Sequence, residues 1–300
     1  MRYFRCPVCG LALEKNDAAR CVVCPNRHSF DRSRRGYVNL LLSQKADRSA
    51  HGDDARMVEA RRQFLSRGYY APLRDALCGL AAKYLRHDGV ILDAGCGEGY
   101  YTHALEAALE ARHPAMLALD ISKKALDYAA RDDQWGGEYA VASVYHMPVA
   151  DSSVDLLISV FSPFCSEEFS RVLTPDGVIL SVIPLENHLM GLKRVLYEQP
   201  YPNAVKPYAL EGYRLLDAIE LRYSIELQSQ EEIGALFGMT PYCYRTSAAG
   251  RDRLAALDTL STPAEFAVLA FGREIARLPR MEAREVTVGG RLEVTVGGRL

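Results

Sequence analysis

Four cysteines and a histidine crowd the first 28 residues of this 300-residue chain. Cys6 and Cys9 form a Cys-x-x-Cys pair, and Cys21, Cys24 and His28 follow within one short segment. A Cys-x-x-Cys turn brings two thiolates to one side of a tight loop, where they can fill half of a tetrahedral zinc shell. The second segment offers three further ligands, so four cysteines or three cysteines plus the histidine are both compatible with the spacing. Because few apolar residues surround these positions, we expect a structural zinc whose binding drives local folding.

A second segment with chemical meaning is a run of alternating glycines. Residues 90–94 are apolar enough for a buried strand, and Gly95, Gly97 and Gly99 follow before the start of a predicted helix. Glycine allows the backbone to pass close to a ligand in conformations that a β-carbon would forbid. A dinucleotide fingerprint, G-x-G-x-x-G, would need a glycine where the chain has Tyr100. The spacing therefore argues against a dinucleotide site.

The G-x-G-x-G spacing, with Asp93 two residues before its first glycine, resembles the first motif of S-adenosylmethionine-dependent methyltransferases. A second predicted strand ends at Asp120, where a carboxylate can bind both ribose hydroxyls. Ser143 follows a third strand, where many methyltransferases place an aspartate facing adenine, and its hydroxyl can still form a hydrogen bond there. Further strands are expected over residues 154–160 and 177–183. The fold class is therefore α/β, a doubly wound Rossmann-like methyltransferase sheet with a small N-terminal zinc-binding domain.

Two helices are predicted between the zinc segment and the sheet. The first begins at Asp53 as N-cap and ends at Gly68, and the second spans about residues 72–86. A loop is expected over residues 43–52. The expected division is a zinc-binding domain (1–35), a linking helical region (36–86), a methyltransferase domain (87–284) and a tail (285–300) that repeats an octapeptide.

Composition limits the classes of protein that this chain can represent. Hydrophobic residues make up 49% and charged residues 25%, which excludes a disordered or collagen-like chain. No apolar run approaches the roughly 18 residues that a membrane span needs, and the N-terminus lacks a secretory apolar region, so we expect a cytoplasmic protein without a membrane partner. Residues 1–70 carry 14 basic and 7 acidic side chains, a balance compatible with phosphate contacts.

The two motifs occur together in one family. The chain resembles the 23S ribosomal RNA (guanine-N1)-methyltransferases, which act on large-subunit rRNA. The match covers most of the chain and lies in residues 6–9, 24–31, 36–41, 60–65, 70–76, 92–103, 188–193 and 239–241. The resemblance implies methyl transfer from S-adenosylmethionine to N1 of a guanine in an rRNA hairpin, by a homodimer.

The resemblance also implies site residues. The zinc shell would be Cys6, Cys9, Cys24 and His28, with Cys21 in place of His28 as the alternative. Contacts to S-adenosylmethionine are implied at Tyr70, Gly97, Glu98 and His188, and they join Asp93, Gly95, Gly99, Asp120 and Ser143 from the residues themselves.

No catalytic base for guanine N1 can be assigned from the sequence, although Glu167, Glu168 and His188 are expected on loops near the site. Two other functions compete with rRNA methylation. One is a small-molecule methyltransferase with a structural zinc knob, against which the basic residues 1–70 count. The other is a non-catalytic RNA-binding scaffold, against which the intact glycine motif and its two aspartates count.

Overall fold

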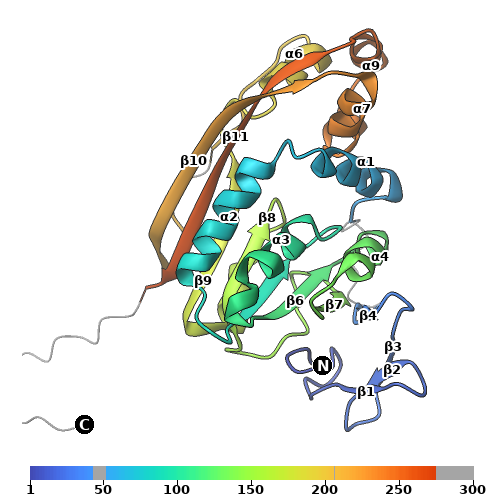
Figure 1. The fold of residues 1–300 in the computed structure, drawn as a ribbon, viewed down its shortest axis with the longest axis vertical. Coiled ribbons are helices and arrows are strands. Elements are labelled where there is room, and N and C mark those ends of the chain that lie inside the picture. Colours follow the sequence, from blue (N-terminus) through green and yellow to red (C-terminus); the bar gives the residue numbers. More distant parts are fainter. Residues whose placement is uncertain (43–51, 206, 275–300) are drawn as a thin grey trace, which may run out of the picture.

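The computed structural model describes residues 1–42, 52–205 and 207–274, which form a small N-terminal ribbon next to a larger α/β domain (Figure 1). The duplicated tail (285–300) and all but the last residue of the expected loop 43–52 lie outside the described residues. The ribbon contains three short antiparallel strands: β1 (Glu14–Asn16), β2 (Cys21–Val23) and β3 (Ser29–Asp31).

The larger domain is built on one eight-stranded sheet with the order β10-β11-β9-β8-β5-β6-β7-β4. Its strands are β4 (Val38–Asn39), β5 (Val90–Ala94), β6 (Ala115–Asp120), β7 (Glu138–Val141), β8 (Val154–Val160), β9 (Leu173–Pro184), β10 (Tyr213–Leu227) and β11 (Leu260–Arg273). The strands from β4 to β9 pair in parallel, while β11 and β10 add an antiparallel edge. The order reverses at β5, so β5 and β8 mark the switch point where ligands bind in such sheets.

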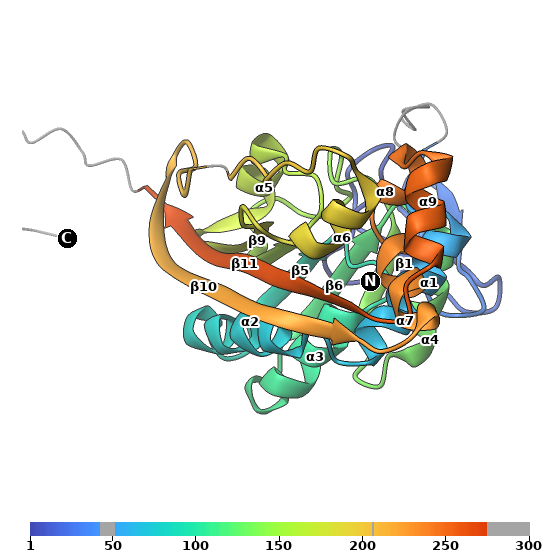
Figure 2. The same ribbon diagram turned by 90° about the horizontal axis from the view of Figure 1, so that it is seen from above.

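Helices cover both faces of the sheet, as Figure 2 shows from above. They are α1 (Ala55–Ser66), α2 (Ala71–Tyr84), α3 (Tyr100–Leu109), α4 (Lys123–Asp132), α5 (Ser166–Val172), α6 (Met190–Leu196), α7 (Gln230–Gly238), α8 (Tyr242–Arg245) and α9 (Ala248–Ala255). Successive residues of β5 point to opposite faces of the sheet and pack in different apolar clusters. Ile91 packs with Leu77 of α2 and Leu105 of α3, whereas Leu92 packs in the opposite cluster with Phe169 of α5.

The structure confirms the predicted doubly wound sheet and corrects two details. Strands β5, β6, β7, β8 and β9 occur in the predicted order. The predicted N-cap at Asp53 is wrong, because the Asp54 carboxylate accepts the backbone N–H groups of Arg56 and Met57. Within the linking region 36–86, β4 pairs with β7 and so extends the main sheet. No helix of the described residues is long and apolar enough to cross a membrane.

Candidate functional site

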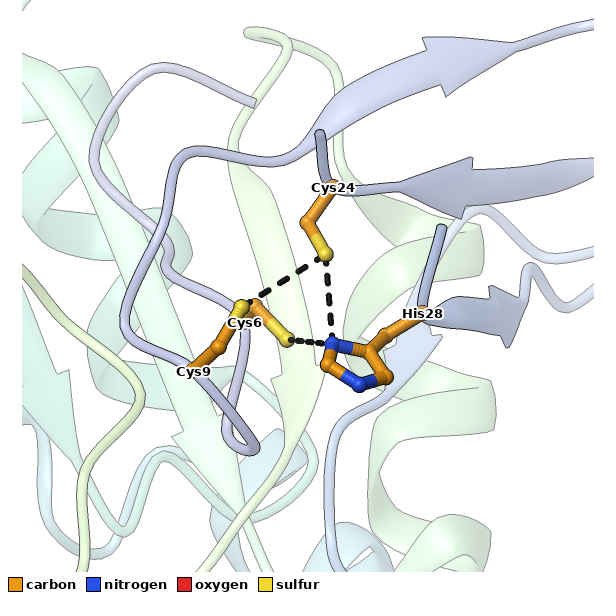
Figure 3. Close-up of side chains that lie close together, drawn as sticks. All are labelled: Cys6, Cys9, Cys24 and His28. Atoms are coloured by element: carbon orange, nitrogen blue, oxygen red, sulfur yellow. Dashed lines mark hydrogen bonds between the residues drawn. The ribbon is translucent and has the colours of Figure 1, made fainter. Parts of the chain in front are cut away.

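The structure brings four metal-ligating side chains together in the ribbon (Figure 3). The ligand atoms of Cys6, Cys9, Cys24 and His28 all lie within 4.8 Å of one another. His28 Nδ1 lies 3.5 Å from the Cys6 sulfur and 3.4 Å from the Cys24 sulfur, which in turn is 3.6 Å from the Cys9 sulfur. Ligands of a tetrahedral zinc, with Zn–S near 2.3 Å, are separated by roughly 3.7 Å. The donor set and its spacing therefore fit Zn²⁺.

Tight turns position these ligands. The Cys6 carbonyl accepts the N–H of Gly10, and the Cys24 carbonyl accepts the N–H of Arg27, so each turn closes over its cysteine. Gly10 has φ +72°, a value that glycine adopts without a steric penalty. A hydrogen bond from the Leu11 backbone N–H lowers the pKa of Cys9, which favours the thiolate that binds metal.

Cys21 lies in β2, outside this group of four. It is buried, with 7% of its surface exposed, and takes part in the pairing of β2 with β1 and β3. The geometry therefore places His28, and not Cys21, beside the other three thiols.

The ribbon is anchored on the larger domain by its first residues. Phe4 is fully buried and forms an isolated bridge with Val149, and the N–H of Arg5 donates to the Pro148 carbonyl. Phe4 belongs to the same apolar cluster as Leu92 of β5. The ribbon and the sheet thus share one core.

The glycine turn between β5 and α3 is formed by three residues with positive φ. Gly95, Gly97 and Gly99 have φ values of +97°, +56° and +92°. A β-carbon on Gly95 would lie 2.5 Å from the Ser162 β-carbon, and one on Gly99 would lie 3.1 Å from the Cα of Ala129. A β-carbon on Gly97 would meet no atom of the described residues closer than 3.9 Å, its chain neighbours apart. Gly97 therefore faces open space, as a glycine that lies against a ligand must.

Asp120, at the end of β6, holds this turn in place. Its Oδ2 accepts the N–H of Gly97 at 2.9 Å, and its Oδ1 accepts the N–H of Ser122 at 2.8 Å. Burial raises the pKa of Asp120, and the two N–H donors oppose that rise. Each carboxylate oxygen keeps a further lone pair, so this group can accept hydroxyl donors beside the turn.

Asp93 is buried at the carboxyl end of β5. Its Oδ2 accepts the Thr102 hydroxyl at 2.7 Å, and the residue is only 2% exposed. Burial, together with the nearby acids Asp120 and Glu98, raises the pKa of Asp93 to about 7, and the hydrogen bond from Thr102 opposes that rise. A cationic group bound beside the turn would favour the ionised form of this carboxyl group.

Tyr70 and His188 come together from distant parts of the chain. The Tyr70 hydroxyl lies 3.4 Å from His188 Nε2, and both residues pack against Phe266 of β11, with ring centroids 4.8 and 4.6 Å away. His188 Nδ1 accepts the N–H of Glu265 at 3.2 Å, so the proton of the neutral ring lies on Nε2. Burial lowers the pKa of His188 to about 3, which keeps the ring neutral.

Ser143 follows β7 and is partly exposed. Its Oγ accepts the N–H of Tyr145, and the residue lines a pocket of about 480 Å³ between the ribbon and the sheet. The described residues thus place Ser143 at the same carboxyl edge as Asp93 and Asp120, because β5, β6 and β7 run in parallel.

Known proteins share both halves of this arrangement. The family model described as "RlmA, N-terminal" matches residues 4–48, and the one described as "Methyltransferase domain" matches residues 92–181. A 23S rRNA (guanine-N(1)-)-methyltransferase, by its name, from Micromonospora griseorubida is 38% identical and covers 82% of this chain and 88% of its own. A chain with the same enzyme name from Bacillus subtilis is 32% identical over 86% of this chain and 92% of its own.

The 23S rRNA (guanine(748)-N(1))-methyltransferase of Streptomyces fradiae is 37% identical over 65% of this chain and 70% of its own. The chain belongs to the 23S rRNA (guanine-N1)-methyltransferase family. Its ribbon is therefore a zinc ribbon, and the ligand for which its glycine turn is shaped is S-adenosylmethionine.

Arg61 lies near the glycine turn but was not among the site residues predicted from the sequence. Arg61 of α1 forms an ion pair with Asp53 and donates to the Met239 carbonyl at 3.4 Å. Its Nη1 is the atom that lies 3.9 Å from the β-carbon position of Gly97. Burial raises the pKa of Glu98, and the neighbouring Arg61 opposes that rise. The signal that could have found Arg61 was its place in the family motif at residues 60–65.

Two of the acids expected near the site differ in their surroundings. Both Glu168 carboxylate oxygens bind Arg171 of the same helix, and Oε2 also accepts the N–H of Met147. Glu168 therefore fixes the loop after Ser143. Glu167, its neighbour, also lies in the first turn of α5, so the expectation that these two acids lie on a loop is wrong.

Proposed function

We propose that this protein transfers a methyl group from S-adenosylmethionine to N1 of a guanine in 23S rRNA. The observation that carries the proposal is the similarity to relatives of that name over 82–86% of the chain, zinc ribbon and methyltransferase domain together. A small-molecule enzyme or an inert scaffold would not need both parts. The basic N-terminal residues, with 14 Lys and Arg among the first 70, support contact with RNA.

The zinc part of the proposal assigns the shell to Cys6, Cys9, Cys24 and His28. The cofactor part assigns S-adenosylmethionine to the residues around the glycine turn. When bound, S-adenosylmethionine supplies an electrophilic methyl group. Asp120 would accept hydrogen bonds from the ribose hydroxyls, and Asp93 would face the cationic groups of the methionine part. Gly95, Gly97, Glu98 and Gly99 would form one wall of the cofactor site. Tyr70, His188 and Ser143 complete the proposed contacts.

His188 does not serve as the base that removes the N1 proton. Its Nδ1 lone pair accepts the Glu265 N–H and its Nε2 carries the ring proton, so no lone pair is left for guanine. The role that fits this geometry is to donate to Tyr70 and to hold its ring. Positioning the guanine in line with the methyl group would then supply much of the rate enhancement.

The test of the function is methyl transfer to a defined RNA. The purified protein is incubated with labelled S-adenosylmethionine and an unmodified 23S rRNA transcript, which is then digested to nucleosides and mapped by reverse transcription. We expect labelled 1-methylguanosine and one strong stop, because N1 methylation blocks the pairing edge. Labelled product at another base would contradict the assigned specificity, and label in small metabolites alone would contradict the RNA substrate.

The remaining parts of the proposal concern assembly and place. We propose a homodimer that acts on an rRNA hairpin in the cytoplasm, as the family resemblance implies. Light scattering of the purified protein should then give twice the 33.3 kDa of one chain. A mass of one chain at micromolar concentration would contradict the dimer and leave the activity standing.

Cofactor affinity should increase with pH up to about 7. The folded pKa of Asp93 is raised to about 7, and a cationic ligand favours its ionised form, so binding releases a proton below that pH. Affinity should rise by up to about tenfold per pH unit between pH 5.5 and 7. Without ligand the sign is opposite. When the pKa of a carboxyl group is higher in the folded than in the unfolded protein, the free energy of unfolding decreases as the pH rises from the unfolded-state pKa towards 7.

Calorimetric titration of S-adenosylmethionine in buffers between pH 5.5 and 7.5 measures this slope. In Asp93→Asn the slope should flatten, because Glu98 and Asp120, whose pKa values burial also raises, then act alone. The exposed Asp176→Asn at the start of β9 should keep the full slope. Equal slopes in all three proteins would contradict the role of Asp93.

Alanine at Gly97 should weaken cofactor binding more than it weakens the fold. Its φ of +56° costs about 1 kcal/mol for a residue with a β-carbon, and apart from its chain neighbours no described atom lies closer than 3.9 Å to that carbon. The added methyl would instead occupy the space meant for the ligand. Gly99→Ala is the matched comparison, since its β-carbon would clash with His103 and Ala129. We expect Gly99→Ala to lower the melting temperature more, and the reverse order would contradict the assignment of Gly97.

A further inference from the structure

Arg61 presents a guanidinium to the same space that Gly97 and Asp120 border. Its Nη1 lies 3.9 Å from where a Gly97 β-carbon would stand and, apart from Gly97 and its chain neighbours, is the one atom of the described residues within 4 Å of that point. The N–H of Gly97 is in turn bound by Asp120. A glycine backbone, a carboxylate and a guanidinium therefore border one small volume.

The rest of the protein holds Arg61 in this position. Helix α1 packs closely on α7, where a β-carbon on Gly238 would lie 3.0 Å from the β-carbon of Ala60. The N-cap Asp54 accepts the Tyr244 hydroxyl at 2.8 Å. At the other end of the helix, Arg67 pairs with Glu231 and Glu232 of α7. Both ends of α1 are thus tied to α7 and α8, and the helix aims Arg61 at the turn.

The segment before α1 lies against the loop after β6, next to Asp120. A β-carbon on Gly52 would lie 2.4 Å from Ile121 and 3.3 Å from the Ser122 nitrogen, which shows how closely the backbone approaches the loop after β6. The Ser122 hydroxyl donates to the Asp53 carbonyl at 3.1 Å. Asp53 therefore reaches Arg61 from the Asp120 side.

More carboxyl groups than guanidinium groups lie in the surroundings of Arg61. Three carboxyl groups, those of Asp53, Glu98 and Asp120, act on Arg61. An arginine has five N–H donors, and two of them meet acceptors, Asp53 and the Met239 carbonyl, in the part of the chain that the structure describes. The methionine end of S-adenosylmethionine carries an ammonium and a carboxylate. The acids around the turn suit the cationic groups, and a fork of N–H donors suits the carboxylate.

We propose that Arg61 binds the methionine carboxylate of S-adenosylmethionine, with Asp53 as the residue that positions its guanidinium. This inference rests on the proposed function, since it names a contact to the cofactor of that activity. Arg61 keeps its pair with Asp53 through Nη1 and offers its remaining N–H groups to the ligand. The contact selects a cofactor with an intact amino-acid end.

The test compares two ligands that differ only in this carboxylate. Calorimetry measures the dissociation constants of S-adenosylmethionine and of decarboxylated S-adenosylmethionine for the unaltered protein and for Arg61→Gln. Loss of a charged pair should weaken S-adenosylmethionine binding by roughly 10- to 100-fold. Binding of the decarboxylated ligand should change by less than about threefold, because it lacks the group that Arg61 contacts.

Two further variants separate this contact from a general effect on the fold. Arg61→Lys keeps the charge without the fork and should recover part of the lost affinity for S-adenosylmethionine. Arg67→Gln removes an arginine from the same helix that pairs with α7 and should leave the ratio of the two dissociation constants unchanged.

Three outcomes would overturn the inference. Equal weakening of both ligands would make Arg61 a structural residue, and tighter binding in Arg61→Gln would make it a competitor for the site. Unchanged binding of both ligands would place the carboxylate contact elsewhere. Failure of the unaltered protein to bind S-adenosylmethionine at all would instead contradict the proposed function.

Discussion

Replacing Cys24 with serine should leave the protein without zinc and without an ordered ribbon. Cys24 is the thiol that lies within 3.6 Å of both Cys9 and His28, so its loss removes a central ligand of the shell. Structural zinc contributes apparent binding free energies of about 10–16 kcal/mol in small domains, and the strands β1 to β3 hold only three residues each. The metal content should fall from about one zinc per chain to nearly none.

The Cys24→Ser substitution should affect the zinc ribbon and leave cofactor binding by the methyltransferase domain nearly unchanged. Trypsin should cleave Cys24→Ser rapidly within the ribbon, at positions such as Lys15 and Arg20, and methyl transfer to rRNA should fall by at least about tenfold as the basic ribbon is lost from the RNA contact. Cofactor affinity should stay within about threefold of the unaltered protein, since the glycine turn lies in the other domain.

Cys21→Ser is the matched control for this experiment. Its thiol lies outside the group of four, so zinc content, trypsin resistance and activity should all be retained. His28→Ala should behave like Cys24→Ser, with a smaller loss of metal affinity because three thiolates remain. Loss of zinc in Cys21→Ser together with its retention in His28→Ala would establish the four-cysteine shell instead.

Asparagine in place of Asp120 should abolish useful cofactor binding. The carboxylate accepts the N–H groups of Gly97 and Ser122 with its two oxygens, and an amide can accept only with one. At the second contact the amide NH2 group would face a backbone N–H group, and two donors cannot form a hydrogen bond, so the glycine turn is disturbed. The charged acceptor proposed for the ribose hydroxyls is lost as well. At about 1.5–3 kcal/mol for each such hydrogen bond, affinity for S-adenosylmethionine should fall by roughly 100-fold or more.

Titration calorimetry and thermal melting together measure this effect. The melting temperature of Asp120→Asn should rise less than that of the unaltered protein when saturating S-adenosylmethionine is added, because binding to the folded state sets that rise. Asp176→Asn, an exposed aspartate at the far edge of the sheet, should match the unaltered protein in both measurements. An unchanged affinity in Asp120→Asn would remove Asp120 from the cofactor site.

The parts of the fold predicted correctly are those encoded by short local patterns. The turn around Cys6 and the strand–glycine–helix unit around Gly95 each depend on fewer than about 15 neighbouring residues, and both occur as predicted. The apolar run at residues 154–160 also coincides with β8. In these segments the local preference and the tertiary structure agree.

The parts that were missed depend on contacts between distant residues. Asp53 and Asp54 are both suitable N-caps in isolation, but Asp53 turns towards Arg61 and leaves the helix N-terminus to Asp54. Arg61 itself differs from Arg62 only through the packing of α1 on α7 and α4, which pairs Arg62 with Asp132. Among Cys21, Cys24 and His28, spacing left two shells open, and the three-dimensional arrangement brought His28 to the other thiols.

The position of β11 in the sheet affects how the chain can fold during synthesis. This strand, the last one described, lies between β9 and β10, and its Phe266 packs against Tyr70, which in turn contacts Phe64 of α1. The apolar faces of α1 and α2 therefore pack against a strand that is synthesised about 200 residues later. At ribosomal speeds of about 5–20 residues per second, synthesis of that stretch takes roughly 10–40 s. During that interval a nascent chain exposes those aromatic side chains, and one that stops before β11 keeps them exposed. We therefore expect chaperones to bind the early helices until β11 has left the ribosome.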